Sequence, residues 1–144
     1  MRWLSERLAG LEQTEADLRA RRAARTGGEA PEPEEAEARA AFFRELGALV
    51  EEVAACPGVV GCFAEHDGLL VSTAGEADAA DALAAMACAV AVPARRAAQA
   101  LRLGPLHQML MVGEERKLAL MLVGELSIGI VAPASLRLSS TLNR

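Results

Sequence analysis

The amino-acid sequence predicts an α+β fold, in which one five-stranded antiparallel sheet has helices on both faces. Two of the observations behind this are helical: an amphipathic pattern over residues 34–56 and an alanine-rich pattern over 76–101. The third is a set of five short apolar runs bounded by glycine-bearing turns, which is typical of strands. In chain order the elements are a helix, two strands, a helix, three strands and a short terminal helix, an arrangement that packs helices against a single sheet.

Composition limits the class of protein. The chain has 144 residues, 52% of them hydrophobic, which suits one domain with one core. A formal charge of −5 argues against nucleic-acid binding and against docking on an anionic membrane, since both need cationic side chains. The longest apolar run, 82–94, is too short to span a bilayer, and residues 1–11 lack a signal-peptide core. We therefore expect a cytoplasmic protein without nucleic-acid partners or membrane insertion.

Residues 1–25 are predicted to form an N-terminal amphipathic helix, followed by a linker over 26–33 and a domain over 34–144. The apolar stripe of this helix consists of four leucines, Leu4, Leu8, Leu11 and Leu18. Glu15 interrupts the stripe. Because an isolated helix of this length is marginal in water, two alternatives stay open. The segment is either a solvated tail or a helix that docks on a surface or oligomerises.

The domain opens with the amphipathic helix, whose apolar positions are Phe42, Leu46, Leu49, Val50 and Val53. Strands are predicted over 59–65 and 69–73, joined by Asp67-Gly68, a strong hairpin signal because both turn residues need positive φ. With a two-residue loop, one face of this hairpin carries Cys62, Ala64, Leu69 and Val71, and the other carries Phe63 and Leu70. Both faces are therefore apolar and need cover.

The alanine-rich helix over 76–101 has four larger apolar members, Leu83, Met86, Val90 and Val92. Acidic residues gather at its start (Glu76, Asp78, Asp81) and arginines at its end (Arg95, Arg96, Arg102), as the helix dipole favours. Pro93 predicts a kink or a restart. Three strands follow over 106–112, 118–123 and 126–132. The first of them carries no charge and is predicted to be an unguarded sheet edge, so together with the apolar helix it indicates a homodimer.

No catalytic constellation is recognisable in the sequence. Ser127 lacks a glycine elbow and an activating histidine, and is read as a strand serine. His66 is expected to be solvated, and His107 to be an edge-strand residue or an interface contact. The three cysteines form no Cys-x-x-Cys pair and are read as small core residues. We expect no metal, no cofactor and no enzymatic activity.

The segments Cys56-Pro57-Gly58-Val59-Val60-Gly61 and Asp67-Gly68-Leu69-Leu70-Val71-Ser72 resemble the opening of the roadblock/dynein-light-chain domain. The later segments 106–113 and 126–132 are also similar to that family. The resemblance implies a sheet order of 2-1-5-4-3, with the long helix alone on one face. It also implies a two-fold dimer through the long helix and the third strand. The terminal helix is shorter than is usual in the family, and the helix over 1–25 is a candidate to replace it.

Members of this family are dimeric platforms for small Ras-like GTPases or adaptor light chains, and some bacterial relatives stimulate GTP hydrolysis by the partner. The leading hypothesis is therefore a non-catalytic homodimer that binds and regulates such a GTPase, with Arg95 and Arg96 as candidate partner contacts. The predicted dimer interface consists of Leu83, Met86, Val90, His107, Met109 and Met111. A scaffold that recruits a larger assembly through residues 1–25 is the alternative, and it requires a fragment from about Glu34 to stay folded. A third hypothesis is an enzyme or small-ligand sensor.

Overall fold

The computed structural model of the protein describes residues 2–25, 27–28, 30–76 and 79–142. Five strands form one antiparallel sheet of order β2-β1-β5-β4-β3: β1 (Gly61–His66), β2 (Leu69–Gly75), β3 (Gln108–Val112), β4 (Arg116–Val123) and β5 (Leu126–Pro133). The helices are α1 (Arg2–Ala24), α2 (Pro33–Ala54), α3 (Ala80–Ala100) and the short α4 (Leu138–Thr141). The predicted fold class, element order and sheet order are confirmed.

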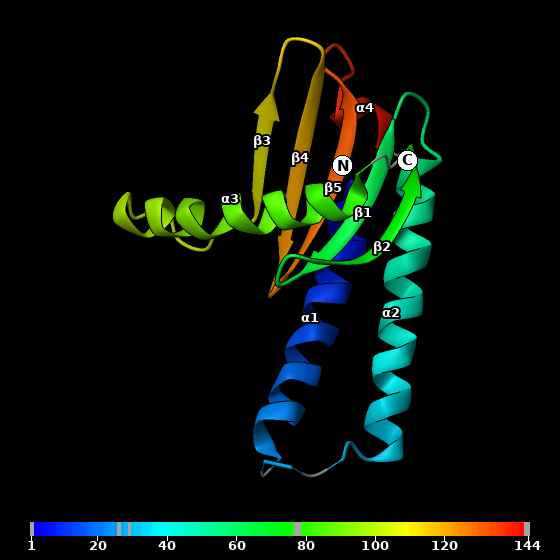
Figure 1. Ribbon diagram of the computed structural model, residues 1–144, viewed down its shortest axis with the longest axis vertical. Coiled ribbons are helices and arrows are strands. Elements are labelled where there is room, and N and C mark those ends of the chain that lie inside the picture. The colour runs from blue at the N-terminus through cyan, green and yellow to red at the C-terminus, as the bar shows by residue number, and fades with distance from the viewer. Residues whose placement is uncertain (1, 26, 29, 77–78, 143–144) are drawn as a thin grey trace.

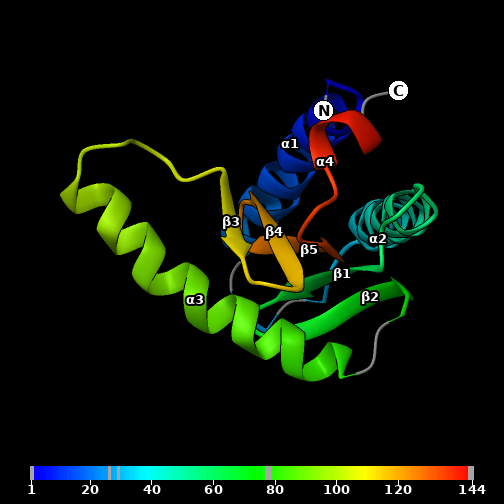
Figure 2. The ribbon, with the colours of Figure 1, turned by 90° about the horizontal axis from the view of Figure 1, so that it is seen from above.

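The helices lie in two layers, one on each face of the sheet (Figures 1 and 2). Alternate strand residues face the α1, α2 and α4 side, where they share a core with α1 and α2; examples are Ala64, Met121 and Ile128. The residues between them face α3, where Phe63 and Leu120 form a smaller core with alanines of the helix. Both faces of the central strands are buried, which explains why their sequences are apolar throughout.

Helix α1 docks on the chain's own core. Leu4 and Leu11 are each 1% exposed and belong to the main core, while Leu8 and Leu18 pack against it. The helix lies against α2 and β4, and an ion pair of 3.1 Å joins Arg7 Nη1 to Glu52 Oε2. Since α4 has only four residues, α1 supplies cover that the terminal helix does not. Of the two alternatives for this segment, docking is the one observed.

The structure differs from the sequence prediction in the first hairpin and in the bounds of two strands. Leu69 pairs with His66 and so lies on the same face as Cys62, as predicted, but it is 72% exposed at the turn. Beyond Leu70 the β1–β2 register shifts, so Ala64 pairs with Ser72 instead of Val71. This bulge inserts Val71 as an extra residue on β2 and changes the alternation of its side chains. The third strand begins at Gln108 instead of 106, and the fourth at Arg116 instead of 118. Residues 26 and 29 of the predicted linker, and Asp78 at the start of the long helix, lie outside the described residues.

Pro93 does not interrupt α3, which runs continuously from Ala80 to Ala100. Proline cannot donate a hydrogen bond to the carbonyl four residues earlier, here that of Ala89. Ala89 and Pro93 both lie on the exposed side of the helix. Water can therefore take the place of the missing donor, and the predicted restart does not occur. Within the described part of the chain, no helix has the length and hydropathy needed to cross a bilayer.

Burial of the Cys62 thiol should make the free energy of unfolding depend on pH in the alkaline range. Burial, and next the charge of Cys56, raise the pKa of the Cys62 thiol from 9.0 to about 12, against a smaller opposite effect of a backbone hydrogen bond from Phe63. The folded state therefore keeps a proton that the unfolded chain loses above pH 9. We expect the free energy of unfolding to be unaffected by this group below pH 9, and to fall by about 1.4 kcal/mol per pH unit between pH 9 and 12.

Urea unfolding across this pH range checks the prediction, with Cys62→Ala as the control whose slope should be flatter. The chain has no tyrosine and one lysine, so few other side chains titrate in this window. Equal slopes for the wild type and Cys62→Ala would assign the pH dependence to another group.

Candidate functional site

The long helix α3 covers only part of its sheet face. It packs on β1, β2 and β5 through a stripe of small buried residues: Ala80, Ala84, Ala87, Ala91 and Ala98. The methyl side chains let the helix backbone approach the sheet closely. The C-terminal half of α3 extends past the edge formed by β3, as the two perpendicular views show (Figures 1 and 2). Part of the helix and part of the sheet are thus left without cover.

Large apolar side chains are exposed around this overhang. They lie on α3, on the segment after it and on β3: Met86, Val92, Leu101, Leu103, Leu110, Met111 and Val112. On the α3 side of the sheet, Met86 is 61% exposed and Met111 38% exposed, values typical of a surface that another molecule covers. Leu110 and Val112 point to the other side of the edge strand, because Leu110 pairs with Ala119 of the main core. We call this surface, made by α3, residues 101–107 and β3, the α3–β3 face.

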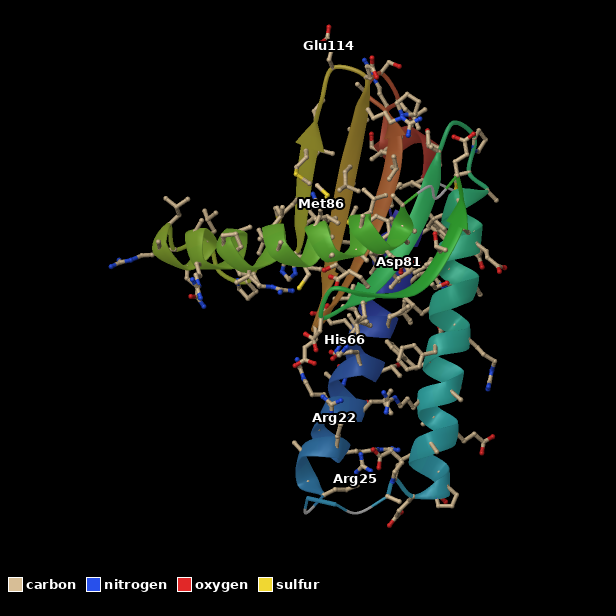
Figure 3. All side chains as sticks on the ribbon, viewed as in Figure 1. Arg22, Arg25, His66, Asp81, Met86 and Glu114 are labelled. Atoms are coloured by element: carbon tan, nitrogen blue, oxygen red, sulfur yellow. The ribbon has the colours of Figure 1, made fainter. Side chains whose placement is uncertain are left out.

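A groove lies in the α3–β3 face between the helix and the sheet, with a volume of about 450 Å³. Its apolar walls are Leu83, Met86, Met111, Leu118 and Val131, and Figure 3 shows Met86 projecting from α3. Arg116 and Lys117 also line the groove. Apolar side chains beside a few charged ones are typical of an interaction surface.

Strand β3 is an edge of the sheet, because it pairs only with β4 in the strand order. Its five residues, Gln108 to Val112, include no charged side chain. An uncharged edge strand offers a row of backbone donors and acceptors to another strand. The predicted edge is confirmed, and nothing in its sequence guards it.

The predicted interface residues fall into three groups. Leu83, Met86 and Met111 meet at the groove, and Met109 lies beside them, half-buried in the core under α3. Val90 is half-buried on α3 but does not line the groove. His107 is exposed at the start of β3 and lines two cavities near α1 instead.

The two candidate partner arginines have different surroundings. Arg95 Nη2 donates a hydrogen bond of 3.1 Å to the carbonyl oxygen of Gly124, which ties α3 to the β4–β5 turn. Arg96 is exposed, so it is the better candidate for contact with another protein. Leu101, Leu103, Leu110 and Val112 were missed by the sequence analysis. Apolar residues occur on both sides of β3. This pattern is the signal by which the sequence could have identified Leu110 and Val112.

His66 and Ser127 have surroundings that explain them as parts of the fold. His66 was expected to be solvated, but it is half-buried, with its Nε2 3.2 Å from Glu125 Oε2. The β1–β2 and β4–β5 turns lie at the same end of the sheet, which brings the two side chains together. Ser127 is 2% exposed within β5. Among the described residues, no group of three or more His, Cys, Asp or Glu side chains is placed to hold a metal ion.

Solved structures resemble this fold at low sequence identity. MglB of Myxococcus xanthus is similar with a TM-score of 0.62 and 16% identity, over 67% of this chain and 76% of that one. An MglB structure with a tetrameric arrangement gives a TM-score of 0.61 and 17% identity, over 69% and 79% of the two chains. The Roadblock/LC7 domain from Streptomyces avermitilis gives a TM-score of 0.56 and 20% identity, over 62% and 78%. At these identities the likeness establishes the fold alone.

Comparison with curated protein sequences finds no match. The family model of the Roadblock/LC7 domain, however, matches residues 45–132, which is more than half of the 144 residues. The match runs from within α2 to the end of β5 and contains the whole α3–β3 face. It confirms the resemblance drawn from the sequence. This chain belongs to the Roadblock/LC7 domain family.

Proposed function

We propose that the protein is a non-catalytic homodimeric module that binds and regulates a small Ras-like GTPase. The observation that carries the proposal is the α3–β3 face, where an apolar helix extends past an uncharged edge strand. Family membership supports it, because the family resemblance implies dimeric platforms for such GTPases. The tetrameric arrangement described for one MglB structure supports self-association of this fold.

The geometry of the face suits a two-fold dimer. Antiparallel pairing of β3 with β3 of a second copy would continue the sheet and satisfy both edges. The overhanging half of α3, with Val92 and Leu101, would then lie over the second copy, while the second copy's helix covers the first. Each patch would contact its own equivalent, as a two-fold interface requires. Met86, Met109 and Met111 supply flexible apolar side chains at the contact.

The GTPase would bind the outer side of the paired α3 helices, where Arg96 is exposed. The α3–β3 face offers apolar and cationic side chains. We therefore expect any stimulation of GTP hydrolysis to come from ordering the partner's own catalytic groups. The scaffold alternative is less well supported. The leucine stripe of α1 that would recruit a partner is buried against the chain's own core.

Affinity capture from lysate of the source cells, with GDP and a non-hydrolysable GTP analogue in parallel, tests the proposal. We expect a small GTPase to be recovered preferentially in one nucleotide state. Arg96→Glu should reduce its recovery about tenfold, because the reversed charge would repel an acidic group of the partner that the arginine attracts. Arg44→Glu, an exposed arginine on α2, is the matched control and should capture as the wild type does. Nucleotide-independent recovery of a large complex without a GTPase would favour the scaffold alternative.

A further inference from the structure

A second cavity lies between α1 and α2, on the far side of the sheet from α3. Its volume is about 90 Å³, and nine of its twelve lining residues precede residue 45, where the family match begins. Figure 3 shows Arg22 and Arg25 between the two helices, with His66 beyond them at the end of the sheet. The cavity is therefore formed mainly by a part of the chain outside the matched family domain.

One wall of the cavity carries a buried carboxylate with an unmet hydrogen bond. Glu15 is 8% exposed, and its Oε2 has no hydrogen-bond partner among the groups that the structure describes. The nearest cation is Arg19, whose Nη2 lies 3.9 Å from Glu15 Oε2, an ion pair beyond hydrogen-bonding distance. Gly124 closes the opposite side so tightly that a Cβ there would overlap the carboxylate. A buried carboxylate oxygen in such a place calls for a hydrogen-bond donor, which a water molecule or a ligand in the cavity can supply.

Guanidinium groups surround the rest of the cavity. Arg25 is held by Glu35 at 3.0 Å, and His66 contacts Glu125. Arg22 and Arg39 also line the cavity and form no ion pair within the described residues, although Arg39 lies over the ring of Phe43 at 5.7 Å. These two guanidinium groups are suited to bind an anion, preferably a planar carboxylate.

Apolar side chains complete the lining of the cavity: Leu18, Phe42, Phe43 and Leu126. A ligand that satisfies this lining has a cationic or N–H donor group for Glu15, an anionic group for Arg22 and Arg39, and a small apolar group for these side chains. The volume has room for a few water molecules or a ligand of comparable size.

We propose that this cavity binds a free amino acid with a small apolar side chain. Its ammonium group would donate to Glu15 Oε2, and its carboxylate would accept from Arg22 and Arg39. The proposal concerns α1 and α2 and is independent of the GTPase-regulating role of the α3–β3 face. Binding there would also brace α1 against α2 and the β4–β5 turn, because the lining comes from all three.

Calorimetric titration of the full chain with L-alanine, L-2-aminobutyrate and L-valine tests the proposal. We expect at least one of them to bind, and its N-acetyl and C-amide derivatives each to bind at least tenfold more weakly, since each lacks one of the two charges. Failure of all three amino acids to bind at millimolar concentration overturns the proposal. Equal binding of the blocked derivatives, or of inorganic phosphate, overturns it as well.

Variants of the cavity residues distinguish side chains that contact the ligand from side chains that only support the fold. Glu15→Gln and Arg22→Gln should each weaken binding at least tenfold, while Arg21→Gln, exposed on the same helix and outside the cavity, should leave it unchanged. Glu15→Gln removes a buried charge, so its melting temperature without ligand should be equal to or above that of the wild type. Wild-type affinity in both cavity variants would contradict the assignment.

Discussion

Replacing Gly129 with alanine is expected to destabilise the fold by about 3 kcal/mol, at the upper end of the usual cost of overpacking a core. Gly129 pairs directly with Phe63 across β5 and β1. The ring of Phe63 lies over the glycine, and a Cβ at position 129 would overlap it. Phe63 is 2% exposed beneath α3 and has little room to move, so either the ring or the helix must shift.

Urea unfolding measures this effect, and Gly10→Ala is the matched control. Gly10 lies within α1, and no neighbouring atom lies within 4 Å of the position that an alanine methyl group would take, so alanine there should stabilise the protein by about 0.5–1 kcal/mol. Adding Phe63→Leu to Gly129→Ala should recover part of the loss, because the smaller side chain frees space at the pair. A Gly129→Ala protein as stable as the wild type would show that Phe63 is not fixed over the glycine.

Truncating Leu11 to alanine is expected to cost about 3 kcal/mol, as for other fully buried leucines. Leu11 is 1% exposed and packs in the core shared by α1, α2 and the sheet. Removal of residues 1–25 should have a larger effect, since it also exposes the apolar face of α2 and β4. The scaffold alternative, by contrast, requires a fragment from about Glu34 to stay folded.

Thermal and urea unfolding of Leu11→Ala, beside Leu69→Ala, checks this account of α1. Leu69 is 72% exposed at the β1–β2 turn, so its truncation should change the free energy of unfolding by no more than about 0.5 kcal/mol. If the fragment lacking residues 1–25 unfolds at the same urea concentration as the full chain, α1 contributes nothing to the core.

Much of the fold could be predicted from local patterns. The hairpin signal at Asp67-Gly68 was reliable because both residues adopt positive φ, 52° and 80°. The docking of α1 could not be derived, because a leucine stripe specifies an apolar neighbour without identifying it. The two-residue loop predicts the pairs next to the turn, His66 with Leu69 and Glu65 with Leu70, but not the register beyond them, so the bulge at Val71 was not predicted. Leu69 lies on the predicted face, but its exposure at the turn was not anticipated.

The two sites differ in how visible they are in the sequence. Met86 and Met111 were predicted as interface residues because an uncharged edge strand and an apolar helix are patterns that one sequence can show. Glu15 was visible only as the residue that interrupts a leucine stripe. Glu15 is buried because its position in that stripe faces the core. A carboxylate at a core-facing position is the signal that could have identified the second cavity. The arginines that line the same cavity come from α1 and α2, whose contact is tertiary.

Light scattering coupled to gel filtration tests the central claim most directly, namely that the α3–β3 face joins two copies of the chain. The wild type should have twice the chain mass of 15.1 kDa. Met86→Glu combined with Met111→Glu should give the single-chain mass, because two charges would be buried in an apolar contact. Leu69→Glu, exposed on the opposite edge strand, should remain a dimer. A wild-type protein of single-chain mass, or a double variant that stays dimeric, would contradict the account.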